Sequence, residues 1–127
     1  MTQELIGLTA LCELGEKEAL TITFEAALME AIDEVFQSLG EDVEQSIYRY
    51  LENNYGIKKV QIPVMIDDFT GAVESIFGVA GKLVELKIMK RLQSKVQGFA
   101  YKPKNKEVLF TDYLISLRKY LDLQEKS

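Results

Sequence analysis

The chain has no histidine, no tryptophan, one cysteine and two prolines among its 127 residues. Without histidine, a histidine-based catalytic triad and a typical histidine-containing transition-metal site are excluded. Cys12 alone cannot form an internal disulfide or a zinc site, and it lacks the usual histidine base of a thiol nucleophile. The sequence therefore predicts a protein that is not an enzyme, with no catalytic, cofactor-binding or metal-binding residues.

Long apolar stretches are absent as well. No run reaches the ~18 to 20 apolar residues that a membrane span needs, and the first four residues lack the basic start of a signal peptide. We therefore expect a cytoplasmic protein with no membrane partner. Hydrophobic residues make up 47% of the chain and charged residues 28%, which is typical of a folded domain. With so few prolines and no Ser/Gly-rich linker, we expect one domain over residues 1–127.

The middle of the chain contains helical periodicity bounded by glycines. Apolar side chains recur at three- and four-residue spacing before each of four glycines, and this spacing places them on one helix face. The glycines are Gly40, Gly56, Gly78 and Gly98. The pattern predicts a first helix between Thr23, its capping residue, and Gly40, and a second helix over residues 41–55. The inward side chains of the second helix would be Val43, Ile47, Tyr50, Leu51 and Tyr55.

Two more helices follow after a connection. Residues 58–66 are expected to connect the second helix to the third and to be extended around residues 60–62. Asp67 or Asp68 would then cap a short third helix. The fourth helix, over about residues 79–97, has so wide an apolar sector that we expect it in the centre of the bundle or at a homodimer interface.

The two ends of the chain carry shorter patterns. Residues 110–121 have the periodicity of a fifth helix, which Thr111 or a residue just before it would open. Residues 1–23 show alternating apolar side chains around a turn-like Gly15, which favours a β-hairpin, although a helix also fits. The predicted fold is all-α, a compact bundle of four to five helices with a possible short N-terminal β-hairpin.

Short sequence words between residues 24 and 96 occur in a particular order and spacing. They are Ala31-Ile32-Asp33-Glu34, Ser38-Leu39-Gly40-Glu41, Ile47-Tyr48, Leu51-Glu52, Tyr55-Gly56-Ile57, Ile62-Pro63, Phe69, Ile76-Phe77-Gly78, Val84-Glu85 and Lys90-Arg91-Leu92. This stretch resembles a small archaeal family of unknown function, the Nitrosopumilus-type output domains. The resemblance implies an α-helical core over residues 24–97 that is joined, in larger chains, to signalling or regulatory domains, and it supplies no catalytic residue. Residues 1–23 and 98–127 are interpreted as extensions specific to this chain.

Charge is separated along the sequence. Residues 1–56 hold 12 acidic and two basic side chains, a formal −10, whereas residues 57–127 hold 13 basic and eight acidic ones, a formal +5. Between residues 82 and 106, Glu85 is the one acidic residue among eight basic ones. The basic residues are Lys82, Lys87, Lys90, Arg91, Lys95, Lys102, Lys104 and Lys106.

This basic stretch is the candidate interaction surface. Three interpretations fit it: a solvated helix face followed by a polar loop, a surface for a protein partner or the acidic half of a second copy, and a nucleic-acid surface. The net charge of −5 and the lack of an Arg-rich pattern disfavour nucleic acid. We therefore expect a protein partner or a homo-oligomer, with a dimer favoured.

Glu85 is the candidate buried acid, because on a helical wheel it lies between Ile88 and Leu92. An ionised carboxylate in such a place is destabilising unless it is paired or hydrogen-bonded. The sequence favours a structural partner, for example Arg49, Tyr48 or a backbone group near a helix start. A pH- or partner-sensitive acid, and a residue at the edge of an interface, stay open as alternatives.

Two other groups have a functional interpretation beside a structural one. Tyr48, Tyr50 and Tyr55 are expected in the core, with an aromatic ligand pocket as the alternative. Asp67 and Asp68 are expected to cap a helix, with a metal site as the alternative. The sequence as a whole predicts a non-enzymatic protein-interaction or regulatory output module. The alternatives are a small nucleic-acid-associated regulator that uses the basic stretch and, third, a carboxylate-based enzyme.

Overall fold

The structure of the protein is a computed structural model, and it describes residues 22–101 and 109–126. All regular structure in these two ranges is helical, so the predicted all-α class is confirmed. The α-helices are α2 (Phe24–Ser38), α3 (Glu41–Tyr55), α4 (Ile66–Phe77), α5 (Gly81–Lys95) and α6 (Phe110–Lys126), and the 3₁₀ helices are η1 (Lys59–Val64) and η2 (Gly78–Ala80). The expected N-terminal hairpin falls mainly on residues 1–21, outside the described ranges. Within those ranges no helix is both long and apolar enough to cross a membrane.

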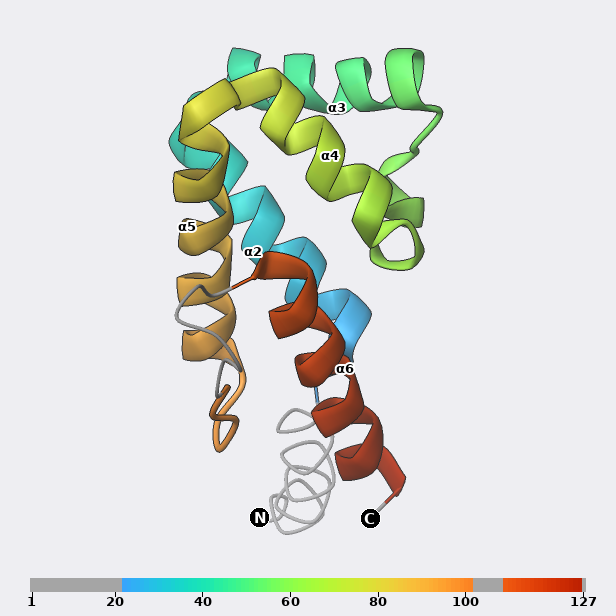
Figure 1. The fold of residues 1–127 in the computed structure, drawn as a ribbon, viewed down its shortest axis with the longest axis vertical. Helices are drawn as coiled ribbons and strands as arrows, with labels where there is room; N and C mark the ends of the chain where they lie inside the picture. Colours follow the sequence, from blue (N-terminus) through green and yellow to red (C-terminus); the bar gives the residue numbers. More distant parts are fainter. Residues whose placement is uncertain (1–21, 102–108, 127) are drawn as a thin grey trace, which may run out of the picture.

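The helices α2 and α5 run side by side, and the other helices pack around this pair (Figure 1). α3 lies across one end of α2, and α4 returns to that end, where η2 leads into α5. α6 packs against α2, α4 and α5. The inner face of α5 therefore contacts three other helices, in agreement with its predicted place in the bundle.

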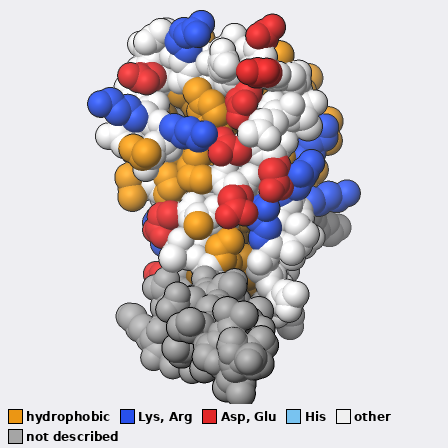
Figure 2. Space-filling view, turned by 180° about the vertical axis from the view of Figure 1, so that it is seen from behind, with side chains coloured by type: hydrophobic (Ala, Val, Ile, Leu, Met, Phe, Trp, Pro, Cys, Tyr) orange, Lys and Arg blue, Asp and Glu red, His pale blue; other side chains and the backbone are white. Residues whose placement is uncertain are grey.

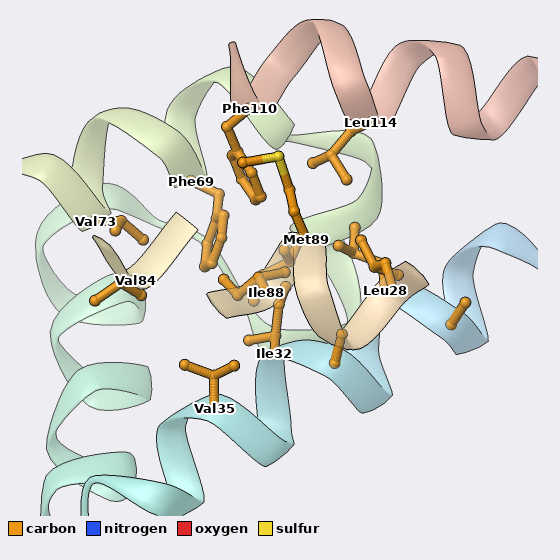
Figure 3. Close-up of a cluster of buried hydrophobic side chains, with 14 of the residues drawn as sticks. Leu28, Ile32, Val35, Phe69, Val73, Val84, Ile88, Met89, Phe110 and Leu114 are labelled. Atoms are coloured by element: carbon orange, nitrogen blue, oxygen red, sulfur yellow. The ribbon is translucent and has the colours of Figure 1, made fainter. Parts of the chain in front are cut away.

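The core lies between α2, α4, α5 and α6 (Figure 3). Its side chains include Leu28, Ile32 and Val35 of α2, Phe69 and Val73 of α4, Val84, Ile88 and Met89 of α5, and Phe110 and Leu114 of α6. All of them are buried. Each helix contributes positions three or four residues apart, because these positions share one face of a helix with 3.6 residues per turn.

Several predicted helix boundaries are confirmed. The Thr23 hydroxyl accepts a hydrogen bond from the N–H of Ala26 at 3.1 Å, as an N-cap does. α3 ends at Gly56, which is left-handed with φ 66° and ψ 25°. The N–H of the buried Ile57 then donates to the carbonyl of Leu51 at 3.1 Å. These boundaries were predictable because each depends on residues within one helical turn.

The connection between α3 and α4 is not extended, and that prediction was wrong. Lys59–Val64 form the 3₁₀ helix η1. Gln61 fixes its first turn, because its side-chain oxygen accepts from the N–H of Lys58 at 2.9 Å and its own N–H donates to the Lys58 carbonyl at 2.8 Å. The fixed φ of Pro63 also suits a 3₁₀ turn. η1 buries Ile62 and leaves Val60 exposed.

The starts of α4 and α5 also differ from the prediction. Asp67 and Asp68 do not cap α4, whose N-cap is Met65 with no side-chain hydrogen bond. They lie in the first turn, where the helix dipole favours negative charge. α5 begins at Gly81 and not at Val79, because η2 forms the corner between the two helices.

At Gly81 the start of α5 packs tightly against α4. A Cβ atom added at Gly81 would lie 3.0 Å from the Cα of Glu74, which is closer than real Cβ contacts normally are. Gly81 is buried. The absence of a side chain therefore lets the start of α5 pack directly on the backbone of α4, and it brings Glu74 beside the first turns of α5.

Candidate functional site

The first candidate surface is a groove between α3 and α4, with a volume of about 520 Å³. Its lining residues are Asp42, Val43, Ser46, Ile47 and Tyr50 of α3, and Ser75, Ile76 and Phe77 of α4. We call it the α3–α4 groove. Val43 is 41% exposed and Tyr50 40%, so large apolar groups of this groove meet solvent.

The exposure of this side of α3 corrects the sequence prediction. Val43, Tyr50 and Tyr55 were expected to face inward, and all three are exposed. The physical reason is that α3 packs on α2 and α4 alone among the described α-helices, so Ile47 and Leu51 are its buried residues. The core prediction for the three tyrosines therefore fails for Tyr50 and Tyr55, whose rings contact each other with centroids 5.9 Å apart.

Tyr48 is the tyrosine that packs on the core. Its ring meets Phe36 edge-on at a centroid distance of 5.5 Å, and its hydroxyl donates to the carboxylate of Asp33. Burial, and next the hydrogen bond to Asp33, raise the pKa of the Tyr48 hydroxyl. Tyr48 therefore fixes α3 on α2 and is not free to pair with Glu85.

The second candidate surface is the outer face of α5, by which we mean Lys82, Leu83, Leu86, Lys87 and Lys90. Leu83 is 55% exposed and Leu86 47%, and the three lysines are exposed as well. Val79 of η2, which precedes this face, is wholly exposed. η2 joins Phe77, which lines the groove, to the first residue of α5. Figure 1 shows this connection at the end of the bundle where α3 begins, so the end of the groove lies near the start of α5.

The predicted basic surface is divided into two parts by the fold. Arg91 donates to Glu34 at 3.1 Å, and Lys95 lies 2.7 Å from Glu34 and 3.3 Å from Glu30. The hydrogen bond from Lys95 lowers the pKa of Glu34, and the same bond raises the pKa of Lys95. Acidic side chains of α2 therefore offset Arg91 and Lys95, and Figure 2 shows acidic and basic side chains lying next to one another on that face.

The remaining basic residues lie either on the outer face of α5 or outside the described ranges. Lys82, Lys87 and Lys90 form no ion pair with any residue in the two described ranges. Lys102, Lys104 and Lys106 lie outside those ranges. The first turn of α3 likewise carries exposed charges, here of negative sign. Glu41 and Asp42 are exposed and form no ion pair within the same ranges.

Glu85 is buried, as its place on the helical wheel predicts, with 5% of its surface exposed. Its partner is neither Arg49 nor Tyr48 but the carboxyl group of Glu74 on α4. Burial first, and the neighbouring Glu74 carboxyl second, raise the pKa of Glu85 to about 7. Glu85 Oε2 has no hydrogen-bond partner among the described residues. A proton on one of the two carboxyl groups would supply the donor that a bond between them needs.

A second pocket, of about 380 Å³, lies between η1, the start of α4 and α6. Asp67 and Asp68 line it together with Arg118. The Arg118 guanidinium donates to the carbonyl of Pro63 at 2.8 Å and lies 4.5 Å from the ring centre of Phe24. Arg118 therefore joins α6 to η1 and α2. In the described part of the chain, no three potential metal-ligating side chains come together.

Comparisons with known proteins place no relative beside this chain. No family model, no curated protein and no solved structure matches it. The resemblance to Nitrosopumilus-type output domains therefore stays a prediction, and the functional argument depends on the α3–α4 groove, the outer face of α5 and the Glu74–Glu85 pair.

Proposed function

We propose that this protein is a non-enzymatic interaction module that pairs with a second copy of itself. The pairing places the outer face of α5 of one copy in the α3–α4 groove of the other. The observation that carries the proposal is the exposure of large apolar side chains on these two adjoining surfaces, with Val79 wholly exposed between them. Exposed apolar patches rimmed by polar residues are typical of protein-binding surfaces.

The charges on the two surfaces favour a second copy as the partner. The outer face of α5 presents three lysines around two leucines, and the first turn of α3 presents Glu41 and Asp42 beside the groove. The two surfaces therefore carry charges of opposite sign, so they are electrostatically complementary. Because both lie at the same end of the bundle, a two-fold dimer would use each surface twice.

Charge exchange tests this pairing. We expect sedimentation at increasing concentration to show dimerisation of the unchanged protein. The variant Lys87→Glu/Lys90→Glu and the variant Glu41→Lys/Asp42→Lys should each weaken dimerisation by at least roughly tenfold, since like charges then meet. Mixing the two variants should restore a heterodimer, because both contacts again join opposite charges.

The control for the charge exchange is Lys119→Glu, an exposed lysine of α6 away from both surfaces. This change should leave dimerisation unaltered. A protein that stays monomeric at every concentration, or a mixture of the two variants that stays monomeric, would contradict the pairing.

A regulatory output role fits the same surfaces. An output domain transmits a signal by changing its contacts, as the resemblance to output domains implies, and a dimerising surface of moderate size is suited to such a change. In this proposal the regulated quantity is the fraction of paired chains.

Nucleic-acid binding is the second candidate function. Lys82, Lys87 and Lys90, which form no ion pair among the described residues, favour it. A gel shift at two salt concentrations distinguishes it from dimerisation. Phosphate contacts release counterions, so binding to nucleic acid must weaken steeply with salt. The variant Lys87→Glu/Lys90→Glu should abolish such a shift, whereas Glu41→Lys/Asp42→Lys should strengthen it.

A further inference from the structure

The Glu74–Glu85 pair lies where α4 turns into α5. Glu85 is on the inner face of α5, buried, and Glu74 is in the last turns of α4. Gly81 brings the two backbones into contact at this point, because a Cβ atom added there would lie only 3.0 Å from the Cα of Glu74. The close packing at Gly81 therefore brings the two carboxyl groups within range of each other, and the α4 residues that follow Glu74 line the groove.

We propose that Glu74 and Glu85 share a proton, that this bond holds α4 against α5, and that loss of the proton loosens the corner and displaces the α4 wall of the α3–α4 groove. In the protonated pair one carboxyl group donates to the other, so both are satisfied. Glu85 Oε2 is buried and has no hydrogen-bond partner among the described residues. In the doubly ionised pair this oxygen would stay unsatisfied, and two negative charges would repel across the helix contact.

The charged surroundings of Glu85 come from few groups. Glu74 of α4 opposes its ionisation, and Lys82, on its own helix, favours it. η2, which also packs on α5, contains no titratable side chain. On α2, Glu30 and Glu34 pair with Lys95 and Arg91, and Asp33 pairs with Lys59. On α6, Arg118 pairs with Glu25 and donates to the Pro63 carbonyl. The further charged groups described on α4 and α6 are exposed at the surface: Asp67, Asp68, Asp112, Lys119 and Asp122. No cation of α2, α4 or α6 neutralises Glu85 in the described part of the chain.

The direction of the pH effect follows from the raised pKa of Glu85. Burial first, and Glu74 second, raise this pKa from 4.5 to about 7 in the folded protein. The folded state therefore holds the proton more tightly than the unfolded chain does. The stabilisation is complete below the unfolded value, decreases as the pH rises, and is lost once the pH passes the folded value. The transition falls near neutral pH.

The pair is linked to the groove through the end of α4. Ser75, Ile76 and Phe77 line the groove and follow Glu74 directly in the sequence. A shift of this last turn of α4 away from α5 moves the same three residues against α3. The pH sensitivity of dimerisation depends on the function proposed above, whereas the proton-sharing pair does not.

The variant Glu85→Gln tests the pair, because an amide donates to Glu74 at every pH as a protonated carboxyl would. We expect the melting temperature of the unchanged protein to fall by roughly 5 °C between pH 5 and pH 8 through this pair. Glu85→Gln should remove most of that decrease. Glu52→Gln, an exposed glutamate of α3, is the matched control and should keep the decrease.

Carbon NMR of the side-chain carboxyl groups in the unchanged protein makes the test independent of any variant. One glutamate should titrate near neutral pH. If all glutamates titrate near their ordinary value, or if Glu85→Gln and the unchanged protein show the same pH dependence, the proton-sharing pair is overturned.

Hydrogen exchange at pH 8 tests the link to the groove separately. The amides of Ser75, Ile76 and Phe77 should exchange several-fold more slowly in Glu85→Gln than in the unchanged protein. Equal exchange would overturn the link. A protein that shows the slower exchange but never dimerises would retain the pair and the link, and only the dimerisation proposal would fail.

Discussion

α2 and α3 have the same length, 15 residues each, but they are held very differently. α2 buries seven residues between α3, α5, α6 and η1, whereas α3 buries two, Ile47 and Leu51. α2 is the more apolar of the two helices and also has more neighbours, so both its composition and its position bury more of its side chains. The comparison shows that an apolar side chain on α2 stabilises the fold, while an apolar side chain on the open side of α3 is available for a partner.

The largest loss of stability is expected for a substitution of a buried core residue on α2. Phe36→Ala removes a fully buried ring that packs on Tyr48 and Phe69. We expect a loss of about 3 to 5 kcal/mol in the free energy of unfolding, because a cavity remains in the core. Urea denaturation measures it.

Tyr50→Ala is the matched change on α3. Tyr50 is exposed in the groove, so the free energy of unfolding should change by less than about 0.5 kcal/mol. Dimerisation should weaken, as sedimentation would show. Equal destabilisation by the two changes would remove the distinction between the helices.

An intermediate effect is expected at the corner between α4 and α5. Gly81→Ala places a methyl group 3.0 Å from the Cα of Glu74, a backbone atom that cannot move aside freely. We expect destabilisation of about 1 to 3 kcal/mol. The comparison variant is Gly71→Ala within α4, where the added methyl group meets open space. It should stabilise the protein by up to about 1 kcal/mol through helix propensity. Thermal unfolding of both variants checks the opposite signs.

A small effect is expected within α5, where one lysine is paired and another is not. Lys95→Met removes the ion pairs with Glu30 and Glu34, and we expect a loss of about 0.5 kcal/mol. Lys87→Met, on the outer face, should leave stability unchanged. Because the pKa of Glu34 is lowered, its contribution is present above pH 4.5 and is lost as the pH falls through the lower folded value. High salt should reduce the difference between the two variants.

Local signals were sufficient for much of the fold. The Thr23 cap, the left-handed Gly56 and the face of α2 depend on residues one or two turns apart, so periodicity and capping rules predict them. The 3₁₀ helix η1 could not be predicted in this way, because its first turn depends on a hydrogen bond between the Gln61 side chain and the N–H of Lys58. The same holds for the corner at η2.

The candidate site was predictable only in part. The helical wheel identifies Glu85 as buried, because its neighbours on that face are apolar. Its partner Glu74 is set by the approach of α4 to α5 at Gly81, which depends on tertiary packing. The exposure of Tyr50 likewise depends on which helices cover α3. The basic stretch was identified, but the offset of Arg91 and Lys95 by α2 requires the pairing of α2 with α5.

The sparse attachment of α3 has a consequence for local unfolding. A helix fixed by Ile47, Leu51 and Tyr48 can detach as a unit while the α2–α5 pair stays folded, since little apolar area is lost. The proposed recognition surface would then belong to the least stable segment of the described fold. A partner bound there would hold α3 in place, so the melting temperature should rise with protein concentration by mass action.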